Sequence, residues 1–460
     1  MRTFKMWFAV CVAALVVVRP LVADGMQSTA DLIAKADSLV RAHKCDAAIA
    51  AYTEAILSDP KSASVYVKRS DAYLLKGDVD KAIVDCTKAI ELDPQSHVAY
   101  ARRGHAHLEK GNSKMAILDA TEAIRLSPKF YSAYLVRGTA HHRMGEYDKA
   151  ITDYSVVVEC DVKNSGSYLL RGYAYEKKGD LAKAIADYTE AIRLAPKNAV
   201  ALRFRVRVYE KMGDYDKAIA DYTEIIQLKP GRAKSYQDRG FAYQVHGDLK
   251  NAIADFTTSI QLDPTNAKWY CRRALAHMLK RDWKSGISDL DQAIAIDPRR
   301  AEAFVDRAIA HYWSGNLDKA IADYTEAIRL DPRAVQSYRG RGDAYAAKKN
   351  CTEKAIADYT EAIRLAPRSP KAYLAYQARG LVYSLNGDQD KAILDFTESI
   401  RLNPKYAAAY YNRGRVYQKK GDAAKADADF AKAKQFGYKQ DMDKSHNDRS
   451  QNEVVPQQRL

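Results

Sequence analysis

The chain has 460 residues, of which 47% are hydrophobic and 28% are charged, and its formal net charge is +15. A globular chain of this length would form two or three domains. Beyond residue 23 the sequence has five cysteines without any Cys-x-x-Cys spacing, which argues against a disulfide framework and against a zinc site. The basic excess suggests acidic partners, but many Lys and Arg residues stand at expected helix C-termini, where the helix dipole favours them.

Residues 1–23 have the pattern of a secretory signal peptide. Two basic residues precede an apolar run over residues 6–18, and Leu21-Val22-Ala23 offers small residues for cleavage. The apolar run is shorter than the roughly 20 residues that span a bilayer. We therefore expect an exported protein, either periplasmic or extracellular. The alternative is a membrane anchor formed by residues 4–22 without cleavage.

A segment of fixed length recurs along most of the chain. The stretch from Gly179 to Pro196 has many near-copies, and successive closing prolines lie 34 residues apart over long stretches. Within residues 163–196, apolar and small residues fall at helical spacing in two blocks. Gly179 is expected to end the first helix, Asp180 to cap the second, and Pro196 to end it. Such a period indicates stacked helix–turn–helix units, none of which can bury its apolar stripe alone.

Twelve such units account for residues 24–438, and the polar residues 439–460 are expected to be a disordered tail. The first unit is degenerate, and the second helix of the last one is rich in Ala, Lys and Asp, as terminal caps often are. The predicted repeats cover residues 27–60, 61–94, 95–128, 129–162, 163–196, 197–230, 231–264, 265–298, 299–332, 333–367, 368–404 and 405–438.

The fifth unit resembles the tetratricopeptide repeat (TPR) at Tyr168, Arg171, Gly172, Tyr175, Ala184, Tyr188 and Pro196. The family normally has Trp, Leu and Phe where this chain has Tyr168, Arg171 and Tyr188. The resemblance recurs over roughly residues 27–438. It implies an all-α fold, a right-handed α-solenoid of stacked antiparallel helix pairs. It also implies a concave face that holds peptides or partner helices.

An arginine precedes the first-helix glycine position in eleven units, and an aspartate takes an inward-facing position of the second helix in eleven units. An arginine row could bind phosphate, but its spacing places it on the packing stripe, where it needs an anion. The first unit has Lys35 and Ala51 at these two positions, and this joint change favours pairing within one repeat. The predicted structural ion pairs include Arg171 with Asp187, Arg239 with Asp255, and Arg307 with Asp323.

The resemblance implies that first-helix residues outside the packing columns line the concave wall. Toward the middle of the chain these positions become aromatic or apolar and include Arg, Tyr and Trp, which are common in binding hot spots. We predict a groove across repeats 5 to 9 that takes an extended segment or an amphipathic helix. The alternative is that this wall packs against the solenoid's own next turn or is unselected. The predicted groove residues are Leu169, Tyr173, Arg203, Phe204, Arg207, Phe241, Arg272, Leu275, Met278, Ile309, Tyr312 and Trp313.

The sequence contains none of the common catalytic or nucleotide-binding motifs. We therefore expect a non-enzymatic TPR scaffold that binds protein or peptide partners through its concave groove, without a small-molecule substrate, cofactor or metal. Membrane contact is expected only through an uncleaved N-terminal segment. One alternative is an accessory subunit of an envelope or secretion complex that is bound through its ends or convex face. Another is nucleic-acid binding through the basic excess, which predicts a steep salt dependence.

Overall fold

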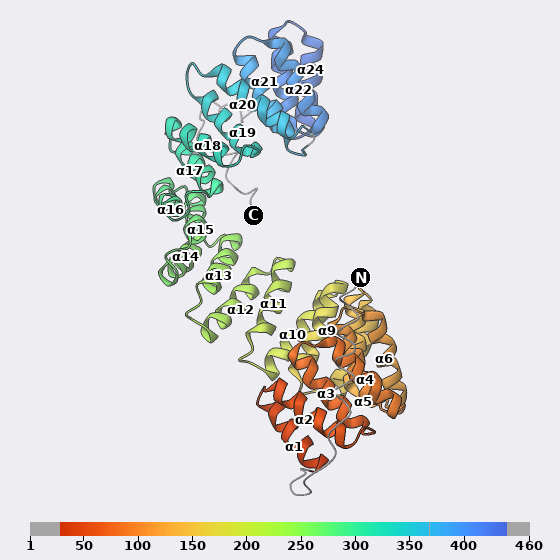
Figure 1. The fold of residues 1–460 in the computed structure, drawn as a ribbon. Coiled ribbons are helices and arrows are strands. Elements are labelled where there is room, and N and C mark those ends of the chain that lie inside the picture. Colours follow the sequence, from red (N-terminus) through yellow and green to blue (C-terminus); the bar gives the residue numbers. More distant parts are fainter. Residues whose placement is uncertain (1–27, 368, 439–460) are drawn as a thin grey trace, which may run out of the picture. The chain divides into compact units, whose positions relative to one another are not determined.

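A computed structural model describes residues 28–367 and 369–438 (Figure 1). The predicted signal peptide and the predicted tail lie outside the described residues. Within them the chain forms 24 α-helices and no strand. Odd-numbered helices are the first helices of consecutive pairs and even-numbered helices are the second. The first helices are α1 (Thr29–Arg41), α3 (Ala63–Lys76), α5 (His97–Glu109), α7 (Tyr131–Arg143), α9 (Ser165–Lys178), α11 (Ala199–Met212), α13 (Ala233–His246), α15 (Ala267–Leu279), α17 (Ala301–Trp313), α19 (Val335–Ala347), α21 (Ala372–Leu385) and α23 (Ala407–Lys419). The second helices are α2 (Cys45–Ser58), α4 (Val79–Leu92), α6 (Ser113–Leu126), α8 (Tyr147–Cys160), α10 (Leu181–Leu194), α12 (Tyr215–Leu228), α14 (Leu249–Leu262), α16 (Trp283–Ile296), α18 (Leu317–Leu330), α20 (Thr352–Leu365), α22 (Gln389–Leu402) and α24 (Ala423–Gln435).

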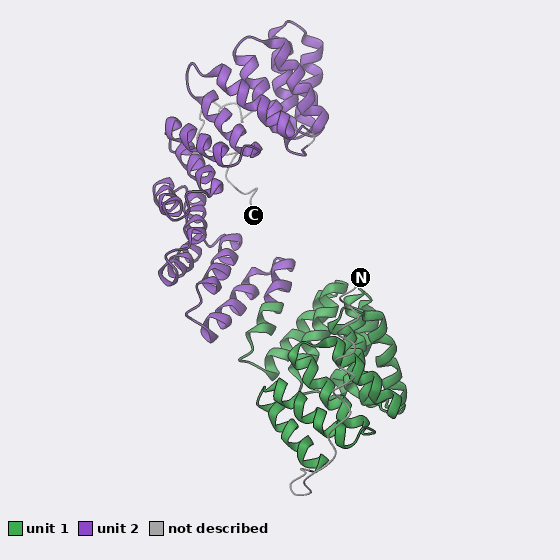
Figure 2. Cartoon of the chain, in the orientation of Figure 1, with its two compact units in different colours: residues 1–204 green, residues 205–460 purple. Residues whose placement is uncertain are grey.

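The chain is an all-α helical-repeat solenoid, and each helix pair lies within one predicted repeat. It divides into two compact units, residues 1–204 and residues 205–460 (Figure 2). Unit 1 contains α1 to α10 and the start of α11, and unit 2 contains the rest of α11 and the helices up to α24. Among the described helices, none combines the length and apolar character that a membrane span requires.

The turn inside each pair follows from its sequence, as the fifth repeat shows. Gly179 ends α9 with a φ of 95°, a left-handed conformation that costs glycine little. The backbone N–H of Asp180 then donates to the carbonyl of Tyr175 at 2.9 Å, which closes the turn. The Asp180 side chain accepts from the backbone N–H of Lys183 at 3.3 Å and caps α10. This geometry sets the two helices of a pair antiparallel.

The core of each pair depends on a close approach between the two helices. Tyr188 of α10 is fully buried and packs over Gly172 of α9, where a Cβ atom would lie 2.8 Å from the tyrosine ring. Phe256 of α14 packs over Gly240 in the same way, at 2.7 Å. Alanines fill most of the remaining contacts. The resemblance residues at these positions therefore serve packing.

Contacts between repeats involve both helices of each pair. A second helix packs against the first helix of the following repeat, as α8 does with α9 and α14 with α15. First helices of consecutive repeats also contact each other, for example α5 with α7 and α17 with α19. Contacts of this kind link α3, α5 and α7 in unit 1 and the first helices from α15 to α23 in unit 2, and we call the face that the first helices form the inner wall.

Candidate functional site

The arginine row is paired with the aspartate row throughout the described chain. All eleven arginines donate from Nε and an Nη to both carboxylate oxygens of the aspartate in their own repeat, at 2.6–3.0 Å. The predicted pairs Arg171–Asp187, Arg239–Asp255 and Arg307–Asp323 have this geometry. The hydrogen bond to Asp187 raises the pKa of Arg171. Planar, two-point contacts of this kind fix the side chains in place.

The same arginines also connect consecutive repeats, which sequence reasoning missed. The remaining Nη of Arg69 donates to Thr53 of the preceding repeat at 3.0 Å, and that of Arg307 contacts Asp291 at 2.6 Å. The available sequence signal was the residue two positions after the second-helix aspartate position, which is a hydroxyl residue in most repeats and Asp291 in the eighth. Further links of this type join Arg103 to Thr87, Arg171 to Ser155, Arg239 to Thr223, Arg273 to Thr257, Arg341 to Thr325, Arg379 to Thr360 and Arg413 to Thr397.

A second set of polar contacts joins the two helices of several pairs. The Tyr188 hydroxyl donates to Glu176 at 3.0 Å, and the Tyr222 hydroxyl donates to Glu210 at 2.8 Å. In the seventh repeat Phe256 replaces the tyrosine. There Gln244 takes the place of the glutamate and is 3% exposed, and neither of its amide atoms has a hydrogen-bond partner in the described structure. A buried amide without a partner destabilises the fold.

Phe256→Tyr is therefore expected to raise the free energy of unfolding by about 1 kcal/mol, because the new hydroxyl can bond to Gln244. Urea unfolding of the full chain measures the change. In a Gln244→Leu background the same substitution should give no gain, since the partner is absent. An equal gain in both backgrounds would show that Gln244 is not involved.

A related acid lies on the inner side of the tenth repeat. The Tyr359 hydroxyl donates to Asp343 at 2.7 Å. Burial raises the pKa of Asp343, although Arg339 and the Tyr359 hydroxyl oppose this effect. The folded protein thus binds this proton more tightly than the unfolded chain. The resulting stability is complete below the unfolded pKa, about 4, and is lost as the pH rises through the folded-state pKa.

Asp343→Asn should therefore increase the free energy of unfolding at neutral pH, because it removes a buried charge while keeping an acceptor for Tyr359. The gain should shrink as the pH falls toward about 4, where the wild-type carboxyl is protonated. Unfolding curves recorded at several pH values measure this difference. A gain that stays constant over the whole range would exclude titration of Asp343 as its cause.

Two of the four predicted groove residues of unit 1, Tyr173 and Phe204, form an aromatic cluster with residues that were not predicted. Phe204 stacks on Tyr173 at 5.7 Å between ring centroids and on Tyr188 at 5.6 Å. His142 lies against the other side of this cluster, 4.9 Å from Tyr173. Leu169 is half-buried and Arg203 is exposed. Part of the surface of Tyr173 and Phe204 is therefore covered by their contact between consecutive first helices.

The predicted groove residues of unit 2 fall into separate groups. The guanidinium of Arg272 lies over the Phe241 ring at 5.0 Å, again between consecutive first helices. Tyr312 meets Trp313 edge-on at 5.6 Å. Ile309 packs beside two core clusters. Arg207 and Leu275, which were also predicted to line the groove, are both half-buried.

Met278 was predicted to line the groove, but the structure places it in the core. It is 1% exposed and packs in the core between α15 and α16. Its Cγ atom lies 3.0 Å from where a Cβ would stand on Gly286. Glycine at that position leaves the room that the methionine side chain fills. Met278 is therefore inaccessible to a partner, and its inclusion in the groove was wrong.

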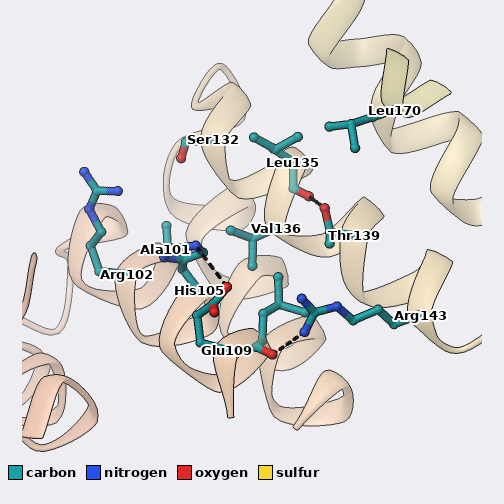
Figure 3. A pocket seen from close by; sticks show the side chains of 11 residues that line it. Ala101, Arg102, His105, Glu109, Ser132, Leu135, Val136, Thr139, Arg143 and Leu170 are labelled. Carbon is teal, nitrogen blue, oxygen red and sulfur yellow. Dashed lines mark hydrogen bonds and ion pairs between the residues drawn. The ribbon is translucent and has the colours of Figure 1, made fainter. Parts of the chain in front are cut away.

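Unit 1 contains a cavity of 270 Å³ on the inner wall, between α5, α7 and α9 (Figure 3). Ala101, Leu108 and Val136 form a buried apolar floor. Leu170 of α9 points toward Leu135 of α7 in Figure 3, and both leucines are half-buried. The cavity thus offers apolar surface at a place where three consecutive repeats meet.

Polar and charged groups surround this floor. Arg102 forms an ion pair with Asp71 at 3.0 Å, and Arg143 donates to the backbone carbonyl of Leu108. The other polar lining residues are His105, Glu109, Ser132 and Thr139. None of the lining residues belongs to the predicted groove, which was placed further along the chain. Among the described residues, no three His, Cys, Asp or Glu side chains gather as metal ligands.

Comparisons with known proteins agree with the repeat pattern. A model described as "Tetratricopeptide repeat" matches residues 33–97, 102–164, 169–233 and 305–370, and a second one matches residues 233–266. A model described as "TPR repeat" matches residues 380–421. A search among curated proteins finds no match.

Several solved structures are similar to the chain. Yeast Tom70 is 18% identical over 94% of this chain and 96% of its own, with a TM-score of 0.43. MamA is 25% identical over 35% of this chain and 93% of its own, with a TM-score of 0.33. A tetratricopeptide repeat protein from Parabacteroides merdae is 18% identical over 55% of this chain and 99% of its own, with a TM-score of 0.40.

Proposed function

Because the chain belongs to the tetratricopeptide repeat family, as models of this repeat match more than half of its length, we propose that it is a non-enzymatic scaffold that holds a protein partner on the inner wall of unit 1. The observation that carries the proposal is the cavity between α5, α7 and α9. It combines an apolar floor with a charged rim, as sites for apolar anchor residues commonly do.

The partner that this cavity suits is an extended segment or an amphipathic helix. One of its apolar side chains would enter between Leu135 and Leu170. Carboxylates or carbonyl groups beside that side chain would meet Arg102 and Arg143 on the rim. The arginine row contributes nothing to this contact, because each of its members is held at two points by a buried aspartate, whereas Arg102 and its partner Asp71 are 41% and 35% exposed. The aromatic cluster at Tyr173 and Phe204 would extend the contact toward the sixth repeat.

Leu135→Glu is expected to abolish partner capture, because it places a charge in the apolar cavity. The experiment is a pull-down from native extract with the full chain, in which mass spectrometry identifies the captured protein. Leu118→Glu is the matched control, since Leu118 lies on α6 outside the cavity and is 62% exposed. Circular dichroism confirms that both variants are folded. Equal capture by both variants would instead favour binding through the convex face or the ends.

We also propose that the protein is exported, on the strength of the signal-peptide pattern in residues 1–23. N-terminal sequencing of the protein from cells tests this proposal. Cleavage predicts a mature chain that starts at Asp24. A chain that keeps Met1 and stays with the membrane fraction would instead indicate an anchor.

A further inference from the structure

A row of exposed ion pairs connects consecutive repeats at the turns between first and second helices. In each pair, a lysine or histidine at the end of a first helix meets the aspartate at the second position of the preceding second helix. Lys76 contacts Asp46 at 2.6 Å, and the partners lie 30 residues apart. The other described pairs at this spacing are Lys110–Asp80 (2.6 Å), Lys178–Asp148 (2.5 Å), His246–Asp216 (3.4 Å), Lys348–Asp318 and Lys420–Asp390.

In the seventh and eighth repeats, lysine replaces the aspartate of this row. Lys250 and Lys284 occupy the second positions of α14 and α16, where the other pairs have aspartate. By register Lys250 faces Lys280, so two like charges stand where an ion pair stands elsewhere. All three lysines are exposed, and none has an ion-pair partner in the described part of the chain. Repulsion between them is relieved when an anion binds.

A stacked pair of tryptophans includes the residue next to Lys284 in the sequence. Trp283, the first residue of α16, directly precedes Lys284 and stacks on Trp313 of α17, with 6.4 Å between ring centroids and 15° between planes. Both indoles are half-buried. We call Lys250, Lys280, Trp283, Lys284 and Trp313 the tryptophan–lysine patch. It lies entirely within unit 2 and shares no residue with the cavity of unit 1.

We propose that the tryptophan–lysine patch binds a short acidic polypeptide segment that also carries an aromatic or aliphatic side chain. The lysines match the carboxylates of such a segment, and the indoles match its apolar side chain. The patch is also short. On one side the row resumes with His246 and Asp216, and on the other with Lys348 and Asp318.

The length of the patch distinguishes a peptide from a nucleic acid. Asp216 and Asp318 are 82% and 81% exposed and flank the lysines. A nucleic-acid strand that followed the row would bring its phosphates toward these carboxylates, which would repel them. A peptide segment can place its acidic residues over the three lysines alone. Charge complementarity therefore favours an acidic peptide as the occupant.

The test measures binding of a fluorescent peptide rich in glutamate and phenylalanine to the full chain by fluorescence anisotropy. The double variant Lys250→Asp/Lys284→Asp restores the aspartates of the row, so we expect it to remain folded while its affinity falls at least about tenfold. The control Lys61→Asp/Lys129→Asp makes the same change in net charge at exposed positions of unit 1, and we expect it to bind like the wild type. Trp313→Leu should weaken binding without changing its salt dependence.

Three outcomes would overturn the proposal. The first is that the wild type does not bind the peptide or binds its glutamine-substituted form equally well. The second is that both charge variants weaken binding to the same extent, which would indicate a non-specific effect of net charge. The third is that single-stranded DNA or phosphatidylglycerol vesicles bind more tightly than the peptide and lose affinity in Lys250→Asp/Lys284→Asp. Because the unit 1 cavity is intact in all these variants, failure here leaves the proposed scaffold function standing.

Discussion

Asp187→Ala is expected to lower the free energy of unfolding of its repeat and neighbours by about 3–5 kcal/mol. Asp187 accepts two hydrogen bonds from Arg171, at 2.7 and 2.9 Å, and the two side chains are only 8% and 19% exposed. Removal of the carboxylate leaves a poorly hydrated guanidinium without its anion. It also leaves the link from Arg171 to Ser155 of the preceding repeat without support.

The matched control is Glu190→Ala on the same helix. Glu190 pairs with Arg193 at 2.6 Å, but these side chains are 33% and 66% exposed. Water replaces such a contact readily, so the expected loss of stability is much smaller than that of Asp187→Ala. Since repeat arrays open locally, hydrogen exchange of α9 and α10 is the appropriate measurement, together with urea unfolding. Similar small losses in both variants would remove the structural role assigned to the buried pairs.

Gly240→Val is expected to destabilise the seventh repeat by about 3 kcal/mol. An added Cβ would lie 2.7 Å from one ring carbon of Phe256 and 2.9 Å from another. Phe256 is fully buried, so the ring can move only if α13 and α14 separate. The extra methyl groups of valine increase the overlap.

Gly231→Val provides the control for this effect. Gly231 is exposed, has no atom within 4 Å of a built Cβ, and is absent from the glycines with positive φ. We expect its substitution to change stability by less than about 0.5 kcal/mol. Thermal unfolding of the two variants beside the wild type measures the contrast. If Gly240→Val unfolds at the same temperature as Gly231→Val, the close approach of the helices does not limit the packing.

The fold was predictable from the sequence because its cause is periodic. Gly179, Asp180 and Pro196 mark the helix ends of one unit, and similar residues recur at 34-residue intervals over most of the repeats. The all-α repeat fold and the family are confirmed. The joint change at Lys35 and Ala51 gave a further clue, that the arginines pair within their own repeats. In each of these cases the relevant contact lies within one repeat and leaves a trace at fixed spacing.

The binding surface was harder to predict because it depends on contacts between repeats. Met278 follows Ala274 by four residues, so it shares the face that packs on the second helix and is buried there. Phe241 and Arg272 belong to consecutive repeats and contact each other, and the residue pattern of one repeat does not predict such a contact. The cavity likewise needs side chains from three helices. Its lining includes Leu135 and Leu170, whose separation in the sequence hides their proximity.

Site-specific photo-crosslinking distinguishes a partner bound on the inner wall of unit 1 from one bound elsewhere. A benzophenone amino acid is placed at Ser132 on the cavity rim, and separately at Leu118 outside the cavity. After irradiation of the full chain with its captured partner, mass spectrometry identifies the crosslinked segment. Binding on the inner wall of unit 1 predicts crosslinks from position 132 to one short partner segment with an apolar side chain, and none from position 118. Crosslinks from position 118 alone would contradict binding on the inner wall of unit 1.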